Sequence, residues 1–384
     1  TWLPHWRVEL KNNTKIFGSP YTFELISYQL NDMLNNQAKK KFGLFDIFDL
    51  EARYEPIRLG EQEILPGLKI FVVHSGHIHG SISVIIKLPN GKNAMFLTDT
   101  AFHNQILLNG AKLLSQIVPK NWIPDMILGT DLTYGFKEQK NYEKELQKLE
   151  NKVIKTVAKN GKVLIPSFML IRGQSAAVAL VKELKKRNIP LFVDGGVRGV
   201  FPIIENKYWS DYEKEFSMDW IQFVKNYNRK ENRDHRQELI DYNGPCVIVS
   251  TSGMGDFGPV GGKYLYPFLK DEKNAIIFIG YQAPGTIGHA LTHANVNNSE
   301  KFFSFHGKRI NFKANVNTID ISAHSGTDKF CDFFEDIIAM REGKKIEFCN
   351  LTHGEKNKKE TAKKLFAPYF DKIHVAETGK IIEF

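Results

Sequence analysis

A strand, a helix and a second strand follow one another at residues 162–166, 173–186 and 191–194. This order is typical of a right-handed βαβ unit, which requires a parallel sheet with helices packed on its faces. Two further apolar runs, 246–251 and 275–280, each end in a glycine-rich loop before a helical stretch. Open α/β sheets bind ligands at such loops, so we expect these loops to face a cleft.

The first third of the chain has a different pattern, which implies a second sheet. Helices are predicted at 21–36 and 105–118, among short apolar runs that indicate strands. Two of these strands, 83–88 and 95–98, are joined by a turn with the Asn-Gly pair of a hairpin. A single hydrophobic core rarely grows beyond roughly 250–300 residues. Because this chain has 384 residues, we expect two domains.

The composition is that of a folded protein, with a modest preference for an anionic partner. Lys and Arg number 52 against 43 Asp and Glu, which gives a net charge of +9. The three cysteines lack CxxC spacing, so they indicate neither a disulfide framework nor a cysteine zinc site. A reducing cytoplasm fits this usage best. No apolar run approaches the ~20 residues that cross a bilayer, so no membrane is expected.

Several short segments place a metal-binding or proton-carrying side chain at a strand end, among small residues. Each is weak alone, because a single His or Asp at a strand end is more often a hydrogen-bonded structural residue. The segments are 74–80, 98–100, 130–135, 321–326 and 351–355.

In this order, with Arg172-Gly-Gln174 and the segment 280–286 between them, the motifs resemble the β-CASP nucleases of the metallo-β-lactamase superfamily. The resemblance begins near Lys15 and continues to the end of the chain. It implies an α/β fold, namely a metallo-β-lactamase αββα sandwich with an inserted β-CASP domain. The expected domains are 1–135 and 316–384 for the first fold and 136–315 for the insertion, which covers the site in the family.

The resemblance also implies a role for each acid and histidine. His77 corresponds to the zinc-binding His of the third metallo-β-lactamase motif, and Asp99, the only acid in its segment, to the bridging Asp of the fourth. The motif A acid becomes Asp131, and the motif B histidine becomes His324. The motif C histidine, a ligand of the second zinc, becomes His353. DNA-cleaving members typically have Val at this last position, so His353 favours RNA.

These residue types suit phosphodiester hydrolysis. Two metals roughly 3.5–4 Å apart can hold a hydroxide and clamp the attacking and leaving oxygens. Imidazole and carboxylate are suitable zinc ligands. We expect His324 to protonate the departing ribose oxygen, and Asp131 to orient it or a metal-bound water. By family resemblance, the products are a 5′-phosphate and a 3′-hydroxyl.

Four residues are predicted to bind substrate. Arg172 and Gln282 belong to family motifs, whereas Ser252 and Gly253 lie in a loop after a buried strand, where backbone N–H groups can meet a phosphate. A tight turn is the alternative for that loop.

Other histidines are given no metal role. His74 and His79 flank His77, and we favour a supporting or surface position for both, although alternation could place His79 on the same face as His77. His289 and His293 lie four residues apart on a predicted helix and are interpreted as surface or substrate-facing residues.

The family's main metal motif, His-x-His-x-Asp-His, does not occur in this chain. The opening segment 1–6 resembles the helix that follows that motif, so we expect the motif upstream of Thr1. The favoured interpretation is an active nuclease whose N-terminal piece is separate from this chain. The alternatives are a non-catalytic module that binds RNA or a partner, and a metallo-β-lactamase-fold hydrolase of a small molecule or of another phosphodiester such as DNA.

The expected cofactor is Zn²⁺, two ions per complete site and fewer in this chain. The expected partners are RNA and either a separate N-terminal segment or a second copy of the chain. The sequence does not separate endonuclease from exonuclease.

Overall fold

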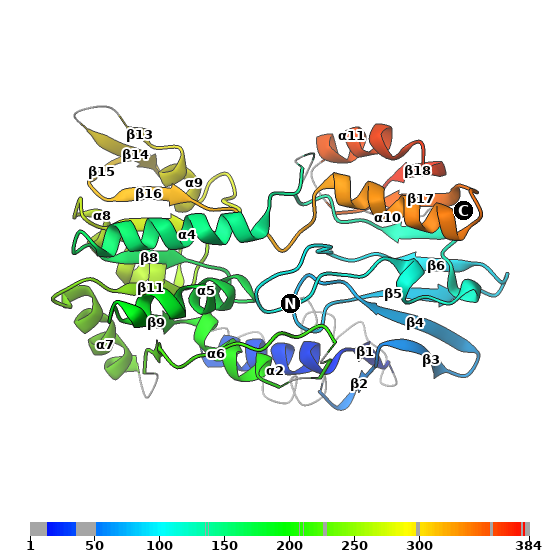
Figure 1. The fold of residues 1–384 in the computed structure, drawn as a ribbon, viewed down its shortest axis with the longest axis horizontal. Helices are drawn as coiled ribbons and strands as arrows, with labels where there is room; N and C mark the ends of the chain where they lie inside the picture. Colours follow the sequence, from blue (N-terminus) through cyan, green and yellow to red (C-terminus); the bar gives the residue numbers. More distant parts are fainter. Residues whose placement is uncertain are drawn as a thin grey trace.

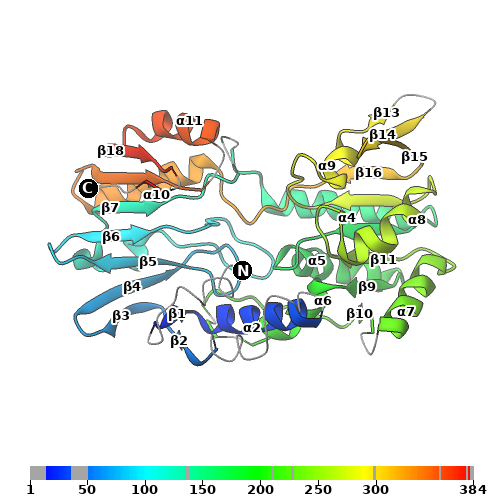
Figure 2. The same ribbon diagram turned by 180° about the vertical axis from the view of Figure 1, so that it is seen from behind.

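Two large sheets lie side by side along the long axis of the molecule, as the computed structural model shows in two opposite views (Figure 1, Figure 2). The structure describes residues 14–35, 51–134, 136, 138–206, 208–209, 211–225, 229–296, 300–353, 356–377 and 379–380. None of the helices in these ranges combines the length and the apolar character needed to span a bilayer.

The first sheet has seven strands and mixes two pairing modes. From β3 to β6 neighbouring strands are antiparallel, and from β6 to β18 they are parallel. The predicted hairpin is confirmed, with Lys87 paired to Asn93 and Gly91 at a φ of 83° in the turn. Across the sheet the strands are β18 (Phe370–Val375), β17 (Ile346–Leu351), β7 (Met126–Gly129), β6 (Asn93–Phe96), β5 (Ile82–Lys87), β4 (Leu68–His74) and β3 (Gly60–Leu65).

Two helices cover one face of this sheet, α10 (Thr327–Met340) and α11 (Lys356–Phe366). The apolar side chains of α10 recur at residues 330, 333, 334 and 337, the spacing of a single helix face. That face packs on the sheet and on Phe366, so the helix is held by burial of its aromatic stripe.

The second sheet has six strands, all parallel. Its inner strands are buried along their whole length, as expected for a parallel sheet covered on both faces. The βαβ unit predicted at 162–194 is confirmed. Across the sheet the strands are β10 (Ile221–Phe223), β9 (Leu191–Asp194), β11 (Val247–Ser250), β8 (Val163–Pro166), β12 (Ala275–Phe278) and β16 (Asn315–Thr318).

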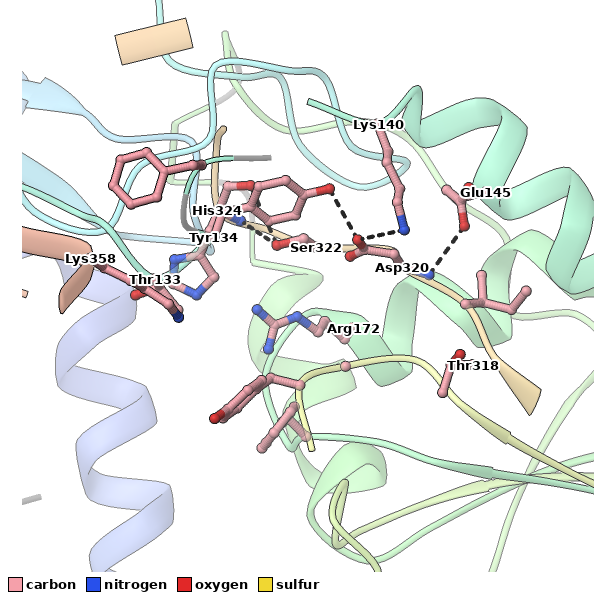
Figure 3. Close-up of a pocket in the computed structure, with 15 residues that line it drawn as sticks. Thr133, Tyr134, Lys140, Glu145, Arg172, Thr318, Asp320, Ser322, His324 and Lys358 are labelled. Carbon is pink, nitrogen blue, oxygen red and sulfur yellow. Dashed lines mark hydrogen bonds and ion pairs between the residues drawn. The ribbon is translucent and has the colours of Figure 1, made fainter. Parts of the chain in front are cut away.

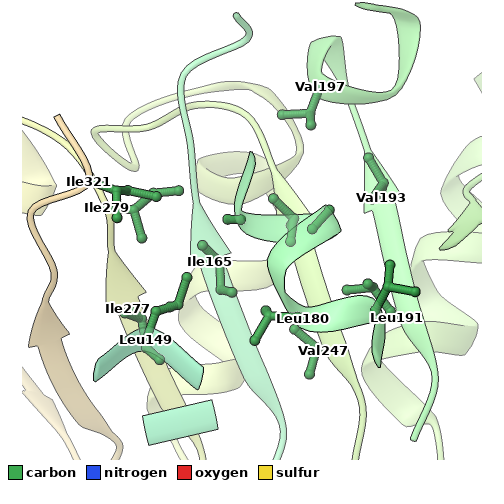
Figure 4. Packing of buried hydrophobic residues seen from close by; sticks show 14 of the residues in the cluster. Leu149, Ile165, Leu180, Leu191, Val193, Val197, Val247, Ile277, Ile279 and Ile321 are labelled. Atoms are coloured by element: carbon green, nitrogen blue, oxygen red, sulfur yellow. The ribbon is translucent and has the colours of Figure 1, made fainter. Parts of the chain in front are cut away.

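Helices lie on both faces of the six-stranded sheet, and alternate residues of each strand face alternate cores. On one side Ile165 and Val247 pack with Leu149 and Leu180 (Figure 4). On the other, Leu164 joins the opposite core. The helices of the first face are α4 (Tyr142–Val157), α5 (Arg172–Lys186) and α6 (Gly196–Ile204), and those of the second are α7 (Arg229–Asp241) and α8 (Leu265–Leu269).

A further helix, α2 (Pro20–Asn35), packs against α6 and so joins the first part of the chain to the second sheet. The hydroxyl of its buried Tyr21 donates a hydrogen bond to Glu213 at 2.5 Å. The remaining short elements are β1 (Ile16–Gly18), β2 (Tyr54–Pro56), β13 (Asn295–Val296), β14 (Lys301–Phe305), β15 (Lys308–Phe312), α9 (Ile287–Thr292), the 3-10 turns η2 (Leu114–Gln116) and η3 (Lys120–Trp122), and the π-helical η4 (Val260–Tyr264).

The helix predicted at 105–118 was wrong, since only η2 forms there. The backbone of this segment bonds to other parts of the chain instead. The Asn109 N–H donates to the carbonyl of Tyr212, and the Ala111 N–H donates to that of Ala101. The apolar residues Leu107 and Leu108 are fully buried in this irregular conformation, so tertiary contacts outweigh the helical spacing.

Candidate active site

The predicted acids and histidines gather at one edge of the seven-stranded sheet. Asp99, Asp131 and His353 follow β6, β7 and β17, whose carboxyl ends meet at one edge because these strands are parallel. β4 runs in the same direction, since two antiparallel pairings separate it from β6. The turn after β4 therefore brings His77 to the same edge.

His77 is oriented by a backbone carbonyl. Its Nδ1 lies 2.8 Å from the carbonyl oxygen of Ala323, and its Nε2 lies 3.9 Å from Oδ2 of Asp99. Burial, with the nearby His324, lowers the pKa of His77 to about 3. A neutral imidazole with Nδ1–H donated to a carbonyl offers the lone pair of Nε2, which is the usual geometry of a metal-binding histidine.

Asp99 stands between two histidines. Its other carboxylate oxygen, Oδ1, is 3.4 Å from Nδ1 of His353, whose side chain is 55% exposed. Burial and the negative charge of Asp131 raise the pKa of Asp99. A bound cation would stabilise the ionised form of this carboxylate, because its positive charge offsets both the burial and the repulsion from Asp131.

Asp131 and His324 form a buried hydrogen-bonded pair. The distance from Oδ2 of Asp131 to Nδ1 of His324 is 2.6 Å, and the Asp131 side chain is fully buried. The backbone N–H of Thr133 donates to the other oxygen at 2.9 Å. Burial alone would raise the pKa of Asp131, but the His324 contact and the Thr133 N–H hold it below the ordinary value. Asp131 therefore fixes the imidazole and leaves Nε2 of His324 available.

The arrangement fits a divalent metal ion. His77, Asp99 and His324 each offer a ligand atom within 4.8 Å of the other two. Two imidazole nitrogens and a carboxylate oxygen are a donor set that zinc accepts. The set includes His324, for which we predicted a proton-carrying role. His353 is not a member of the set but contacts Asp99. A carboxylate-bound histidine serves equally as a metal ligand or as an acid, and the position of His324 suits both roles.

A cavity of about 630 Å³ opens beside His324, between the two sheets. Figure 3 shows Arg172, Lys358 and Asp320 among the residues that line it. Asp320 accepts a hydrogen bond from Tyr134 at 3.0 Å and pairs with Lys140 at 3.1 Å. The cavity thus carries several cations next to the donor set, as an anionic ligand requires.

Three contributors to this site were not predicted from the sequence. Asp320 lies one residue before the segment 321–326, so an acid next to a predicted motif was the available signal. Lys358 belongs to a lysine-rich stretch that is usually a solvated helix face, yet it lines the cavity. The orienting carbonyl of Ala323 carries no sequence signal.

Of the residues predicted to bind substrate, Arg172 alone lines this cavity. Ser252 and Gly253 lie in a turn that packs against Phe168. The side-chain amide of Gln282 donates a hydrogen bond to the Gly253 carbonyl at 3.0 Å and so holds this turn in place. A Cβ on Gly253 would lie only 2.8 Å from the Phe168 nitrogen, so the turn packs directly against the segment that precedes Arg172.

None of His74, His79, His289 and His293 is a member of the donor set. His74 and His79 are buried rather than at the surface, with exposed fractions of 2% and 3%. His74 packs on Tyr212 and accepts a hydrogen bond from the Gly76 N–H. His289 and His293 stack on each other at the end of α9. Residues 354 and 355 of the last predicted motif lie outside the described residues.

The chain is similar to one domain family and to several proteins whose names describe ribonucleases. A family model, the Beta-Casp domain, matches residues 177–291. The chain is 28% identical to an RNase J-like protein of Methanocaldococcus jannaschii over 89% of its own length and 76% of that protein. It is 24% identical to a ribonuclease of Thermus thermophilus over 95% of its length and 81% of that protein.

A third relative is the transcription termination factor FttA of Methanocaldococcus jannaschii, at 31% identity over 60% of this chain. The chain spans only 36% of that protein's length.

Proposed function

We propose that this chain, which belongs to the β-CASP family of the metallo-β-lactamase superfamily, cleaves RNA as a zinc-dependent phosphodiesterase. Two relatives that match most of the chain are named ribonucleases or RNase J-like. One observation carries the proposal. The donor set His77, Asp99 and His324 lies beside a cation-lined cavity, and its His324 is hydrogen-bonded to the buried Asp131.

The division into domains at 135/136 and 315/316 remains part of this proposal. β16 pairs with β12 in the six-stranded sheet, so that sheet extends a few residues beyond the predicted end of the insertion.

His77 and Asp99 are the proposed metal ligands, with His353 completing the set from the exposed side. The Ala323 carbonyl fixes the ring of His77, and Asp99 faces both histidines. When bound, zinc supplies a Lewis acid for the phosphoryl oxygen and lowers the pKa of a coordinated water.

His324 is the proposed general acid, because Asp131 holds its Nδ1 and leaves Nε2 directed away from the carboxylate. Protonating the departing ribose oxygen from this nitrogen would complete hydrolysis to a 5′-phosphate and a 3′-hydroxyl. Ser252, Gly253 and Gln282 are proposed to contact the substrate from the turn packed on Phe168.

A non-catalytic module that binds RNA is the second candidate. A binding module would have no use for a fully buried carboxylate fixed on a histidine. Burying a carboxylate is costly unless it is paired, and here the pair faces the donor set, so we favour the enzyme.

The test is a comparison of matched single-stranded RNA and DNA oligonucleotides with the full-length protein and added zinc. We expect RNA to be cut faster than DNA, and binding to weaken with salt because the contacts are mainly to phosphates. An Asp99→Asn variant should lose cleavage, and Asp271→Asn, at an exposed turn, should not. Equal or faster cleavage of DNA would overturn the RNA assignment, and RNA binding without cleavage would favour the second candidate.

A further inference from the structure

Arg172 is a largely buried cation that lacks an anion of its own. Among the described residues its side chain forms no salt bridge and no hydrogen bond, and its Nε is buried without a partner. Two acids whose charges act on Arg172 are otherwise engaged, Asp320 with Lys140 and Asp131 with His324. A buried charge without a partner is costly, which points to a ligand that supplies the missing anion.

A strained turn delivers this side chain to the cavity. Ile171, directly before α5, has a φ of 60° and a ψ of −48°. The Arg172 N–H donates to the Leu170 carbonyl at 2.8 Å, which closes a γ-turn with positive φ, a rare and unfavourable conformation for a β-branched residue. Ile171 is only 3% exposed, so burial in the core holds the turn in place.

The guanidinium also has a fixed support. It stands 5.3 Å from the centre of the Phe168 ring, a distance at which a cation and an aromatic face attract. Phe168 itself is confined, because a Cβ on Gly280 would come within 2.7 Å of its ring. Turn and ring together restrict where the guanidinium can lie.

From these observations we propose that Arg172 binds the non-bridging oxygens of the scissile phosphodiester and stabilises the negative charge that grows on them in the transition state. The inference rests on the proposed ribonuclease function. The proposed metal ligands His77 and Asp99 lie on the side of the seven-stranded sheet, and Arg172 lies on the side of the six-stranded sheet. A planar guanidinium suits this task, since it donates two parallel hydrogen bonds to a phosphate. Arg172 exchanges no proton in this role.

The test uses Arg172→Ala and Arg172→Lys in the full-length protein, with zinc content, RNA affinity and kcat measured separately. A donor aimed at transition-state charge is worth about 10²–10³-fold in rate, so we expect kcat of Arg172→Ala to fall by about that factor. Zinc content should stay normal, and the Kd for RNA should change much less than kcat. Free guanidinium ion should restore part of the lost rate in Arg172→Ala and none in His324→Ala.

The matched control is Arg187→Ala, at the other end of α5, where the arginine pairs with Glu183 at the surface. Its kcat should stay near wild type. If Arg172→Ala melts well below wild type, Arg172→Lys is the deciding variant. We expect it to keep the wild-type melting temperature and still lose at least about tenfold in kcat. An unchanged kcat, a loss confined to RNA affinity, or a loss of zinc would overturn the inference. A wild-type protein that does not cut RNA would instead refute the proposed function.

Discussion

At the scale of single residues, holding a metal and moving a proton can be separated by experiment. His353→Ala should lower zinc content and rate together, because removing a ligand weakens the metal itself. His324→Ala should leave zinc content near normal and reduce the rate by about 10²–10⁴-fold, the usual worth of a positioned general acid. Metal analysis and single-turnover cleavage of RNA measure the two effects.

An activated aryl phosphodiester sharpens this comparison, since its leaving group needs no proton. The defect of His324→Ala should shrink on that substrate, and the defect of His353→Ala should not. His306→Ala, at an exposed turn between β14 and β15, is the control and should change neither zinc nor rate. Loss of zinc from His324→Ala would make His324 a ligand, as its place in the donor set also allows, and our assignment of the acid would then be wrong.

How far single residues can be predicted depends on whether their partner is near in sequence. The segments around Asp131 and His324 stood out because each puts a reactive side chain among small residues. That the two form a 2.6 Å pair could not be derived from spacing, since 193 residues separate them. For the same reason, the contact of His77 with the Ala323 carbonyl and the ion pair of Asp320 with Lys140 could not be predicted.

At the scale of elements, prediction succeeded where the hydrophobic pattern and the local propensity agree. The helix predicted at 173–186 is observed as α5 at residues 172–186, and the strands of the βαβ unit lie within a residue of their predicted ends. The segment 105–118 failed because its leucines are buried by long-range contacts of an irregular backbone, with the Lys214 N–H bonded to the Leu107 carbonyl. Periodicity alone does not report such contacts.

The aromatic stripe of α10 should dominate the stability of the seven-stranded sheet. Phe334 is fully buried and packs edge-on against Phe366 and Phe370. Phe334→Ala leaves a large cavity and should cost about 3–5 kcal/mol of unfolding free energy. Urea denaturation followed by circular dichroism measures this cost. Phe257→Ala is the matched control, because that ring is 71% exposed and its removal should change stability by no more than about 0.5 kcal/mol. Similar midpoints for the two variants would contradict the assigned core.

At the scale of the whole molecule, both passages of the chain between the two sheets border the cavity. Gln139, on the outward passage, accepts a hydrogen bond from the Gly326 N–H at 2.9 Å, and its own N–H donates to Asp328 at 3.1 Å. Asp320, on the return passage, binds Tyr134 and Lys140. The passages are thus tied to each other at the place where Asp131 and His324 meet, so the position of one sheet on the other and the geometry of the site depend on the same contacts.

The ligands available in this chain of 384 residues limit how many zinc ions it can bind. Catalytic zinc ions usually have three protein ligands each, whereas within the described residues the donor set holds His77, Asp99 and His324, with His353 beside Asp99. We therefore expect fewer than two zinc ions per chain after dialysis, and very slow cleavage of RNA by this chain alone. Elemental analysis of the dialysed protein gives the count, and Asp99→Asn should lower it further. Two tightly held ions would mean that further ligands exist. His79, buried with an unpartnered Nδ1, would be examined first by substitution, and His74, whose Nδ1 accepts from Gly76, second.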